Sequence, residues 1–419
     1  MRSLYTAFLY LLAPLVIIRL AWRGLRAPGY WRHWPERFGV ISPAVGEQVI
    51  WIHAVSVGEV QAVAPVVRAL LERHQQYSLL VTTVTPTGSA QVAELFEDHV
   101  AHVFAPYDLP GAVARFLERV RPQLAIIMET ELWPNLFHAC SDSGISLLLV
   151  NARLSERSMS GYSRFHRLIG STLETTTEIL AQSGEDARRF EKLGVDRRKI
   201  TVSGNLKFEQ QIPADLPEGA RDLRQQWGAD RLVWIAGSTH EGEDELVLDV
   251  FRRVRKQIPD CLLVLVPRHP ERFDAVAGLA RQRGFNTVLR SDRVACSLDT
   301  SVFIGDTIGE LMLFYAAADV AFVGGSLVHT GGHNLLEPAA AGIPVITGPN
   351  IDNFAEISEL LVNAGACRIV ESTAELEAVV LQWLQDADGC RRAGMLGRDV
   401  VRLNRGALET VMMTIEKYL

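Results

Sequence analysis

The sequence predicts an α/β protein with two doubly wound, Rossmann-like domains that face each other across a cleft, preceded by an N-terminal membrane anchor helix. Three observations lead to this fold class. An apolar segment opens the chain, short apolar segments then alternate with amphipathic ones, and a polar stretch with several prolines interrupts the alternation near the middle. The 419 residues are also enough for two domains of ~100–200 residues each.

The first segment, residues 1–38, is predicted to be a membrane anchor with an interfacial end. Its apolar stretch SLYTAFLYLLAPLVII contains no charge, but its sixteen residues are slightly fewer than the ~20 that span a bilayer. Five arginines follow, interleaved with four aromatic residues: Arg19, Arg23, Arg26, Arg32 and Arg37 with Trp22, Tyr30, Trp31 and Trp34. This arginine excess places the body of the protein in the cytoplasm.

This segment has two other interpretations. A cleaved signal peptide is disfavoured because no small-x-small cleavage motif follows the apolar stretch. A buried core helix is an alternative, since apolar segments this short are often found in protein cores. The favoured interpretation is an uncleaved anchor that either spans the membrane or lies in its interface.

Residues 39–208 are predicted to form the N-terminal Rossmann-like domain. Its candidate strands are continuous apolar runs, as expected for parallel strands covered on both faces: 48–54, 78–85, 99–105, 123–129 and 145–150. The segment between the first two shows the spacing of an amphipathic helix.

A polar stretch at 209–230 is predicted to be the interdomain linker, because Pro213, Pro217 and Gly219 interrupt the pattern there. Residues 231–400 then form the C-terminal Rossmann-like domain, and 401–419 a C-terminal helix. The second domain's candidate strands are 231–238, 261–267, 301–306, 319–325 and 343–348.

Composition and missing motifs exclude several classes of protein. The net charge of −7, from 42 basic and 49 acidic residues, argues against a globally basic nucleic-acid-binding protein, though not against a local basic patch. Five scattered cysteines without a CxxC pair predict neither a disulfide framework nor a zinc knuckle. Because no GxGxxG follows the first strand of either half and no GxxxxGK[ST] occurs, dinucleotide-binding and P-loop proteins are disfavoured.

Polar residues gather where the strands of the first domain end, and ligands bind there in such sheets. Glu59 lies in a predicted first helical turn, where a carboxylate also complements the helix dipole. Glu129 and Glu131 follow the fourth strand, and Lys207 lies just before the linker, where it could equally be solvated. Two further arginines, Arg153 and Arg157, could hold an anionic group or pair with Glu156.

The second domain carries signals for a nucleotide phosphate. Arg268 and His269 end a strong apolar strand, and Gly309 and Glu310 lie at another strand-to-helix transition. The polar turn 331–334 leads into a short helix, a potential anion site of backbone N–H groups, and Glu337 could accept the hydroxyls of a ribose. The acidic cluster at 240–245 and the pair Asp386 and Asp388 are expected on solvated helix ends rather than around a metal.

Taken in order, the motifs WIHAVSVGEV, METELWPN, NARLSERS, GNLKFE, AGSTHEGE, LVPRHPERF and GGSLVHTGGHNLLEPAAAG resemble the 3-deoxy-D-manno-octulosonic acid (Kdo) transferases of Gram-negative lipopolysaccharide assembly. The resemblance covers the whole chain and implies a GT-B glycosyltransferase that needs neither a metal nor a cofactor. It implies Glu59 as general base and Glu129 and Lys207 as transition-state stabilisers. The implied nucleotide contacts are Pro267, Arg268, His269, Ile308, Gly309, Glu310, Asn334, Leu335, Leu336 and Glu337.

The activity implied by this resemblance is inverting transfer of Kdo, expected more than once, from CMP-Kdo to a hydroxyl of the lipid A precursor lipid IVA. The implied partners are this donor, this acceptor and the lipid of the inner membrane, with the catalytic body on the cytoplasmic face. Three rival hypotheses are a membrane-associated GT-B transferase that uses a UDP-sugar, a non-catalytic nucleotide-sugar sensor and, more distantly, a dehydrogenase.

Overall fold

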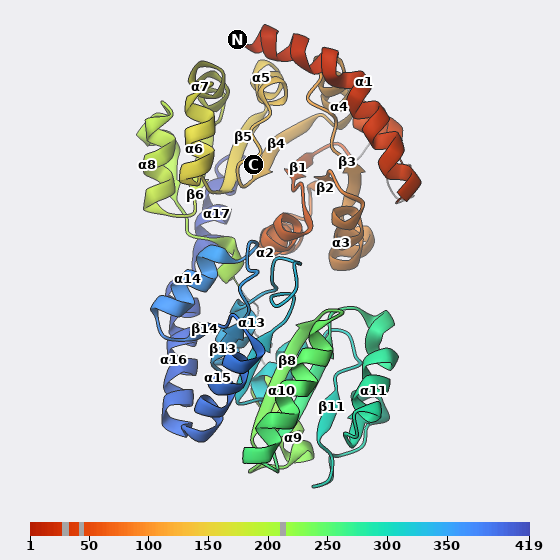
Figure 1. Cartoon of the computed structure of the whole chain (residues 1–419). Helices are drawn as coiled ribbons and strands as arrows, with labels where there is room; N and C mark the ends of the chain where they lie inside the picture. Colours follow the sequence, from red (N-terminus) through yellow and green to blue (C-terminus); the bar gives the residue numbers. More distant parts are fainter. Residues whose placement is uncertain (27–32, 42–45, 210–214) are drawn as a thin grey trace. The chain divides into compact units, whose positions relative to one another are not determined.

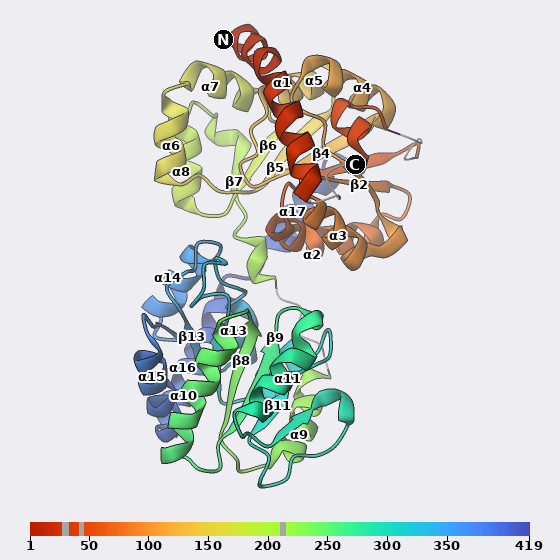
Figure 2. The same ribbon diagram turned by 45° about the vertical axis from the view of Figure 1, so that its right-hand side comes forward.

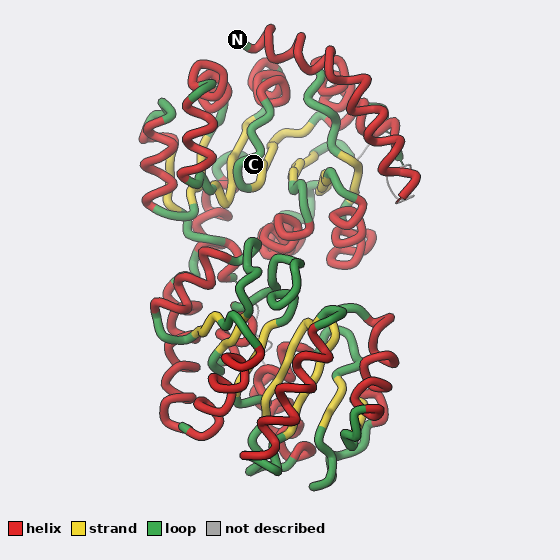
Figure 3. Tube along the Cα trace, in the orientation of Figure 1, coloured by secondary structure: helices red, strands yellow, loops and turns green. Residues whose placement is uncertain are grey.

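The computed structural model of the chain describes residues 1–26, 33–41, 46–209 and 215–419. It divides the chain into two compact units (Figure 1). Unit 1 contains Met1–Glu209 together with Arg405–Leu419, and unit 2 contains Gln210–Asn404. Each unit is a parallel sheet between helices (Figure 3), as the alternating apolar and amphipathic segments predict. The predicted fold class is confirmed.

Unit 1 is built on seven described strands in the order β3-β2-β1-β4-β5-β6-β7, each parallel to its neighbours. Their bounds are β1 Val49–His53, β2 Ser78–Thr83, β3 Ala101–Phe104, β4 Pro122–Met128, β5 Ser146–Ala152, β6 Glu178–Ala181 and β7 Ile200–Val202. The direction in which strands are added to the sheet reverses between β1 and β4. β2 and β3 follow on one side of β1, and β5 to β7 follow on the other side, beyond β4. In a doubly wound sheet this switch point is where ligands bind, at the carboxyl ends of the strands.

Helices cover both faces of this sheet. They are α2 Val57–Arg73, α3 Pro86–Phe96, α4 Pro110–Val120, α5 Pro134–Asp142, α6 Glu156–Ser163, α7 His166–Glu174 and α8 Gly184–Lys192. The C-terminal helix α17, Ala407–Glu416, packs against α2, and its residues Val411, Met412 and Ile415 complete the core on that face. The last residues of the chain therefore belong to unit 1.

The N-terminal helix α1, Arg2–Arg26, is unlike the others because most of its apolar side chains are exposed. Its residues Arg2–Leu25 have a mean hydropathy of 1.9, and length and composition would allow them to cross a membrane. A short 3-10 helix, Trp34–Phe38, follows. Tyr30, Trp31 and Arg32 of the predicted interfacial segment lie outside the described residues.

Unit 2 repeats the doubly wound plan with seven described parallel strands in the order β10-β11-β9-β8-β12-β13-β14. Their bounds are β8 Val233–Thr239, β9 Leu262–Pro267, β10 Thr287–Leu289, β11 Val302–Ile304, β12 Val320–Val323, β13 Val345–Thr347 and β14 Cys367–Ile369. The helices are α9 Leu216–Trp227, α10 Glu243–Gln257, α11 Phe273–Gln282, α12 Leu311–Ala317, α13 Leu336–Ala341, α14 Ala355–Asn363, α15 Thr373–Gln385 and α16 Ala387–Leu403. The switch point lies between β8 and β12. Most of the stretch predicted as a linker is helix α9.

Candidate active site and nucleotide site

The switch point of unit 1 holds the predicted carboxylates. Glu59 stands in the first turn of α2, directly after β1, and Glu129 and Glu131 follow the neighbouring strand β4. The negative charges of Glu129 and Glu131 both act on Glu59. The structure therefore brings these three carboxylates together, where a doubly wound sheet binds its ligand.

Glu59 is nearly buried, with 7% of the residue exposed. Its Oε2 accepts a hydrogen bond from the backbone N–H of Val55 at 2.8 Å, and its Oε1 accepts one from the Ser56 hydroxyl at 3.1 Å. Ser56 is also the N-cap of α2, so one residue starts the helix and holds the carboxylate. Burial, with the charges of Glu129 and Glu131, raises the pKa of Glu59 to about 8, although both hydrogen bonds oppose the shift.

Glu129 pairs with Lys207, whose Nζ lies 3.4 Å from Glu129 Oε1. Both side chains are about a quarter exposed, at 28% and 23% respectively. Glu129 has a φ of 52°, a left-handed conformation that is strained for a residue with a side chain. Its backbone N–H still donates to the carbonyl of Val150 at 2.9 Å, so the strain redirects the chain without disrupting the sheet.

Asn151, a site residue that was not predicted from the sequence, fixes the backbone next to Lys207. This buried residue at the end of β5 has a φ of 56°. Its Oδ1 accepts the backbone N–H of Leu206 at 3.0 Å, which fixes the 3-10 helix Leu206–Phe208 that carries Lys207. The available signal was an asparagine directly after an apolar strand, since asparagine tolerates the left-handed region better than most residues.

Glu131 is oriented by Trp133, whose indole Nε1–H donates to Glu131 Oε2 at 2.9 Å. Burial, with the charge of Glu129, raises the pKa of Glu131. Of the two arginines predicted nearby, Arg153 accepts a hydrogen bond from the Thr130 hydroxyl through its backbone carbonyl, and the side chain of Arg157 is outside the described part. Glu156 lies 3.9 Å from Arg189.

In unit 2 the predicted nucleotide contacts follow neighbouring strands along the carboxyl edge of the sheet. Arg268 and His269 follow β9 and are exposed, whereas Pro267, the last residue of β9, is buried. Burial raises the pKa of Glu337, and the hydrogen bond from Asn334 and the charge of Arg268 oppose this shift. Arg268 therefore lies close enough to Glu337 to act on it across the sheet.

The turn before α13 is held by Asn334. Its Oδ1 accepts the backbone N–H of Leu336 at 3.0 Å, and its Nδ2 donates to Glu337 Oε1 at 3.1 Å. Leu335 and Leu336 are fully buried, so their apolar side chains belong to the interior of unit 2. Gly331 and Gly332, with φ of 88° and 76°, give the turn a path that other residues rarely adopt.

Glu310 pairs with the guanidinium of Arg290 rather than pointing into open solvent. Arg290 makes a bidentate pair with it, the closest contact being 2.7 Å, and the Thr307 hydroxyl donates to it at 2.5 Å. The hydrogen bond from Arg290 holds the pKa of Glu310 below its usual value. These three residues line a cavity of about 620 Å³. Nearby, Ile308 is 76% exposed and Gly309 has a φ of 86°.

The structure corrects the interpretation of the acidic cluster at 240–245, because Glu243 and Asp244 are fully buried rather than solvated. Glu243 accepts four backbone N–H groups: Oε2 those of His240 (3.0 Å) and Gly325 (2.6 Å), Oε1 those of Ser326 (3.0 Å) and Leu327 (2.9 Å). It therefore ties together the turns after β8 and β12, the two strands at the switch point. Asp386, by contrast, caps α16, and Asp388 is exposed as predicted.

Three histidines gather beside Arg268. The Nε2 atoms of His240 and His333 lie 2.7 Å apart and their rings are stacked, while the ring centroid of His269 is 5.2 Å from that of His240. Burial lowers the pKa of His333 to about 3 and lowers that of His240, so both rings are neutral at pH 7. Within the described ranges, no group of three or more His, Cys, Asp or Glu side chains is arranged to hold a metal ion.

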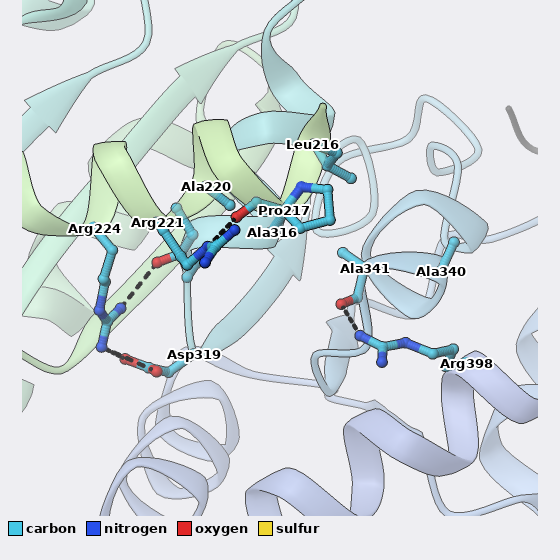
Figure 4. Close-up of a pocket in the computed structure, with 12 residues that line it drawn as sticks. Leu216, Pro217, Ala220, Arg221, Arg224, Ala316, Asp319, Ala340, Ala341 and Arg398 are labelled. Atoms are coloured by element: carbon cyan, nitrogen blue, oxygen red, sulfur yellow. Dashed lines mark hydrogen bonds and ion pairs between the residues drawn. The ribbon is translucent and has the colours of Figure 1, made fainter. Parts of the chain in front are cut away.

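A second cavity, of about 540 Å³, contains none of the predicted site residues (Figure 4). Small residues and three arginines line it. All three arginines are already engaged: Arg221 with the carbonyl of Pro217 at 3.1 Å, Arg224 with Asp319 at 2.8 Å and Arg398 with the carbonyl of Ala341 at 2.8 Å. Because Asp319 precedes β12, this cavity lies at the amino end of that strand, away from the edge where the ligand is expected.

Comparison with known proteins decides the family. The 3-deoxy-D-manno-octulosonic-acid transferase family model matches residues 32–210, and the model of glycosyl transferases group 1 matches residues 238–399. The 3-deoxy-D-manno-octulosonic acid transferase of Haemophilus influenzae is 41% identical over 421 residues, covering 100% of this chain and 99% of that protein. The chain belongs to the Kdo transferases. The Bordetella pertussis member is 36% identical, with the same coverage of both chains.

Solved structures support the GT-B fold of this Kdo transferase. The UDP-GlcNAc 2-epimerase of Neisseria meningitidis, solved with UDP-GlcNAc, aligns over 88% of this chain and 100% of its own, with a TM-score of 0.57 and 14% identity. The glycotransferase of kitacinnamycin aligns over 88% of this chain and 99% of its own, with a TM-score of 0.53 and 16% identity. At this identity the likeness concerns the fold alone.

Proposed function

We propose that this Kdo transferase moves Kdo from CMP-Kdo to a hydroxyl of a lipid A precursor, with inversion at the anomeric carbon, in lipopolysaccharide biosynthesis. The observation that carries the proposal is the group formed by Glu59, Glu129, Glu131 and Lys207 at the switch point of unit 1. It supplies a buried base beside an ion pair, which transfer to a poorly nucleophilic hydroxyl requires.

In the proposed reaction Glu59 is the general base. The acceptor hydroxyl attacks the anomeric carbon while its proton passes to the Glu59 carboxylate, and the bond to the CMP phosphate breaks on the opposite side. Burial makes Glu59 a stronger base than an exposed glutamate, and Val55 and Ser56 fix its orientation. Inversion in a single displacement needs no covalent intermediate with the enzyme.

Glu129 and Lys207 are proposed as transition-state stabilisers. The Lys207 ammonium is compact and three-quarters shielded, which suits it to balance charge that develops as the phosphate departs. Glu129 holds this ammonium at 3.4 Å, and its strained backbone shows that the position is tightly constrained.

We propose that unit 2 holds the donor through Pro267, Arg268, His269, Ile308, Gly309, Glu310, Asn334, Leu335, Leu336 and Glu337. Arg268 is exposed at the strand edge and provides a bidentate partner for the single phosphate of CMP. Glu337 offers a carboxylate to the ribose hydroxyls. A monophosphate leaving group carries less charge than a diphosphate, so these side chains suffice without a divalent ion.

We also propose that α1 attaches the enzyme to the inner membrane, with both units on the cytoplasmic side. The helix is long and apolar, and only 6% of its most apolar 18-residue stretch is buried. The acyl chains of the acceptor remain in the same membrane, so attachment confines enzyme and acceptor to one surface.

Replacing Arg268 by Gln is expected to weaken CMP binding about 10- to 100-fold, because a charged hydrogen-bond partner of the phosphate is lost. Isothermal titration calorimetry with CMP and with UDP measures this and tests the donor class. Arg281→Gln, an exposed arginine on α11, is the matched control and leaves CMP affinity unchanged. Preference of the wild-type enzyme for UDP would instead favour the UDP-sugar transferase.

The pH dependence of Kdo transfer tests the roles of Glu59 and Glu131. Glu59 must be deprotonated to act, so kcat/KM for Kdo transfer is expected to rise with pH, with a midpoint near the Glu59 pKa of about 8. Glu131→Gln removes a negative charge that raises this pKa, and should move the midpoint down by roughly half a unit or more. Glu118→Gln, an exposed glutamate on α4, should not move it. If the midpoint is unchanged in Glu131→Gln, the charge of Glu131 does not act on the pKa of the general base.

A further inference from the structure

Helix α1 presents apolar side chains on two opposite sides. One side faces unit 1 and includes Tyr5, Leu9, Leu20 and Gly24. The outward side is a stripe, each of whose members is at least 53% exposed: Leu4, Phe8, Leu11, Leu15, Ile18, Trp22 and Leu25. At about 100° per residue these seven positions fall within an arc of about 100°. A helix that is apolar all round is expected to be buried on every side, whereas the outward stripe of α1 is exposed.

The start of α1 is attached to unit 1 by hydrogen bonds, and two residues near its end are buried. Near its start, the Tyr5 hydroxyl donates to Asp108 Oδ2 and the Thr6 hydroxyl donates to Asn135 Oδ1, each at 2.9 Å. Asp108 in turn accepts the backbone N–H groups of Asn135 and Leu136 at the start of α5. Near its end, Leu20 and Gly24 are buried. Figures 1 and 2 both show α1 running along the outside of unit 1 beside α5.

The contacts of Tyr5 and Thr6 are incompatible with a helix that crosses the bilayer. Between Tyr5 and Gly24 the helix rises by about 28 Å, close to the ~30 Å thickness of the hydrocarbon core. In a crossing helix Tyr5 and Gly24 would lie on opposite sides of the membrane. The contacts of Tyr5 and Thr6 would then be lost, and Asp108 would lose a hydrogen-bond donor in a partly buried position.

The charges of α1 indicate that a lipid surface covers the outward stripe. The helix contains no acidic residue, and Arg19 flanks the outward stripe on one side. Long arginine side chains can reach phosphate headgroups while the neighbouring apolar side chains enter the acyl region.

We infer that α1 lies in the plane of the membrane as a monotopic helix, with its inner side packed on unit 1 and its outward stripe inserted into one leaflet of an anionic bilayer. The inference rests on the membrane attachment proposed above and specifies its geometry. It fixes unit 1, and therefore Glu59, at one height above the lipid.

Site-directed spin labelling of the full chain tests this geometry. Leu4→Cys, Leu15→Cys and Leu25→Cys are labelled separately in a Cys296→Ser background, because Cys296 is half-buried whereas the other four cysteines are buried. The proteins are bound to vesicles of phosphatidylethanolamine and phosphatidylglycerol, and oxygen and nickel accessibility give the depth of each label. Leu9→Cys, on the inner side, is the matched control.

The three stripe labels are expected at one shallow depth, about 5–10 Å below the headgroups, with Leu9→Cys unchanged by lipid. A deep label at 15, with labels 4 and 25 at opposite surfaces, would overturn the in-plane geometry while leaving membrane attachment intact. Labels that remain in water at all three positions would overturn both. Neither readout depends on transfer activity, so the proposed reaction is tested separately.

Discussion

Replacing Glu59 by Gln is expected to lower kcat for Kdo transfer by about 10²- to 10⁴-fold, the usual contribution of a general base. Gln has nearly the same shape and retains an oxygen that can accept the Val55 N–H, so the local structure should be kept. It cannot take a proton from the acceptor hydroxyl. The measurement is the initial rate of product formation with donor and acceptor both saturating.

The expected accompanying result is unchanged CMP affinity, because the proposed nucleotide contacts all belong to unit 2 and Glu59 belongs to unit 1. Glu118→Gln, an exposed glutamate of the same unit, provides the control with full activity. If Glu59→Gln kept more than a tenth of wild-type kcat, the assignment of the base would be wrong. Loss of CMP binding together with activity would indicate a folding defect instead of a lost base.

Glu243→Gln is expected to destabilise unit 2 by about 3–5 kcal/mol, the range observed when one partner of a buried charged group is removed. Four backbone N–H groups converge on the two carboxylate oxygens of Glu243. Whichever way the amide is turned, its NH₂ group faces two N–H donors and leaves them unpaired. Urea unfolding, followed by the fluorescence of the buried Trp227 and Trp234, measures the loss.

Glu241→Gln is the matched control, because Glu241 lies in the same turn but is exposed. Its effect on the free energy of unfolding should stay within ±0.5 kcal/mol, as for most surface substitutions. A loss below about 1 kcal/mol in Glu243→Gln would show that the four N–H groups find other partners and that this carboxylate does not hold the switch point together.

The sheets could be predicted because their central strands are long apolar runs. All ten predicted strands are present. Four more strands of the described residues were not predicted: β6, β7, β10 and β14. β7, β10 and β14 lie at sheet edges and have three residues each, and β6 next to β7 has only four. β11 and β13 also have three residues but could be predicted, because all their residues are buried and lie in apolar runs. The missed edge strands β7, β10 and β14 each contain exposed or half-buried residues, so the apolar run that signals a buried strand is absent.

The positions of the candidate site residues at strand ends could be predicted, because doubly wound sheets bind ligands there. The contacts that hold those residues could not. Glu243 finds its partners about 80 residues later in the chain, at Gly325, Ser326 and Leu327. A glutamate surrounded by other acidic residues has the pattern of a solvated helix end, and only the fold shows that it is buried. Asn151 and Leu206, 55 positions apart, are a similar case.

The most direct test of the proposed function is mass spectrometry of a tetraacylated lipid A precursor after incubation with the enzyme and preformed CMP-Kdo. The expected product is heavier by one or more Kdo residues, forms equally well with and without EDTA, and is absent with Glu59→Gln. No change in mass with competent donor and acceptor would contradict the proposed reaction, and a product formed only without EDTA would contradict its independence of a metal ion.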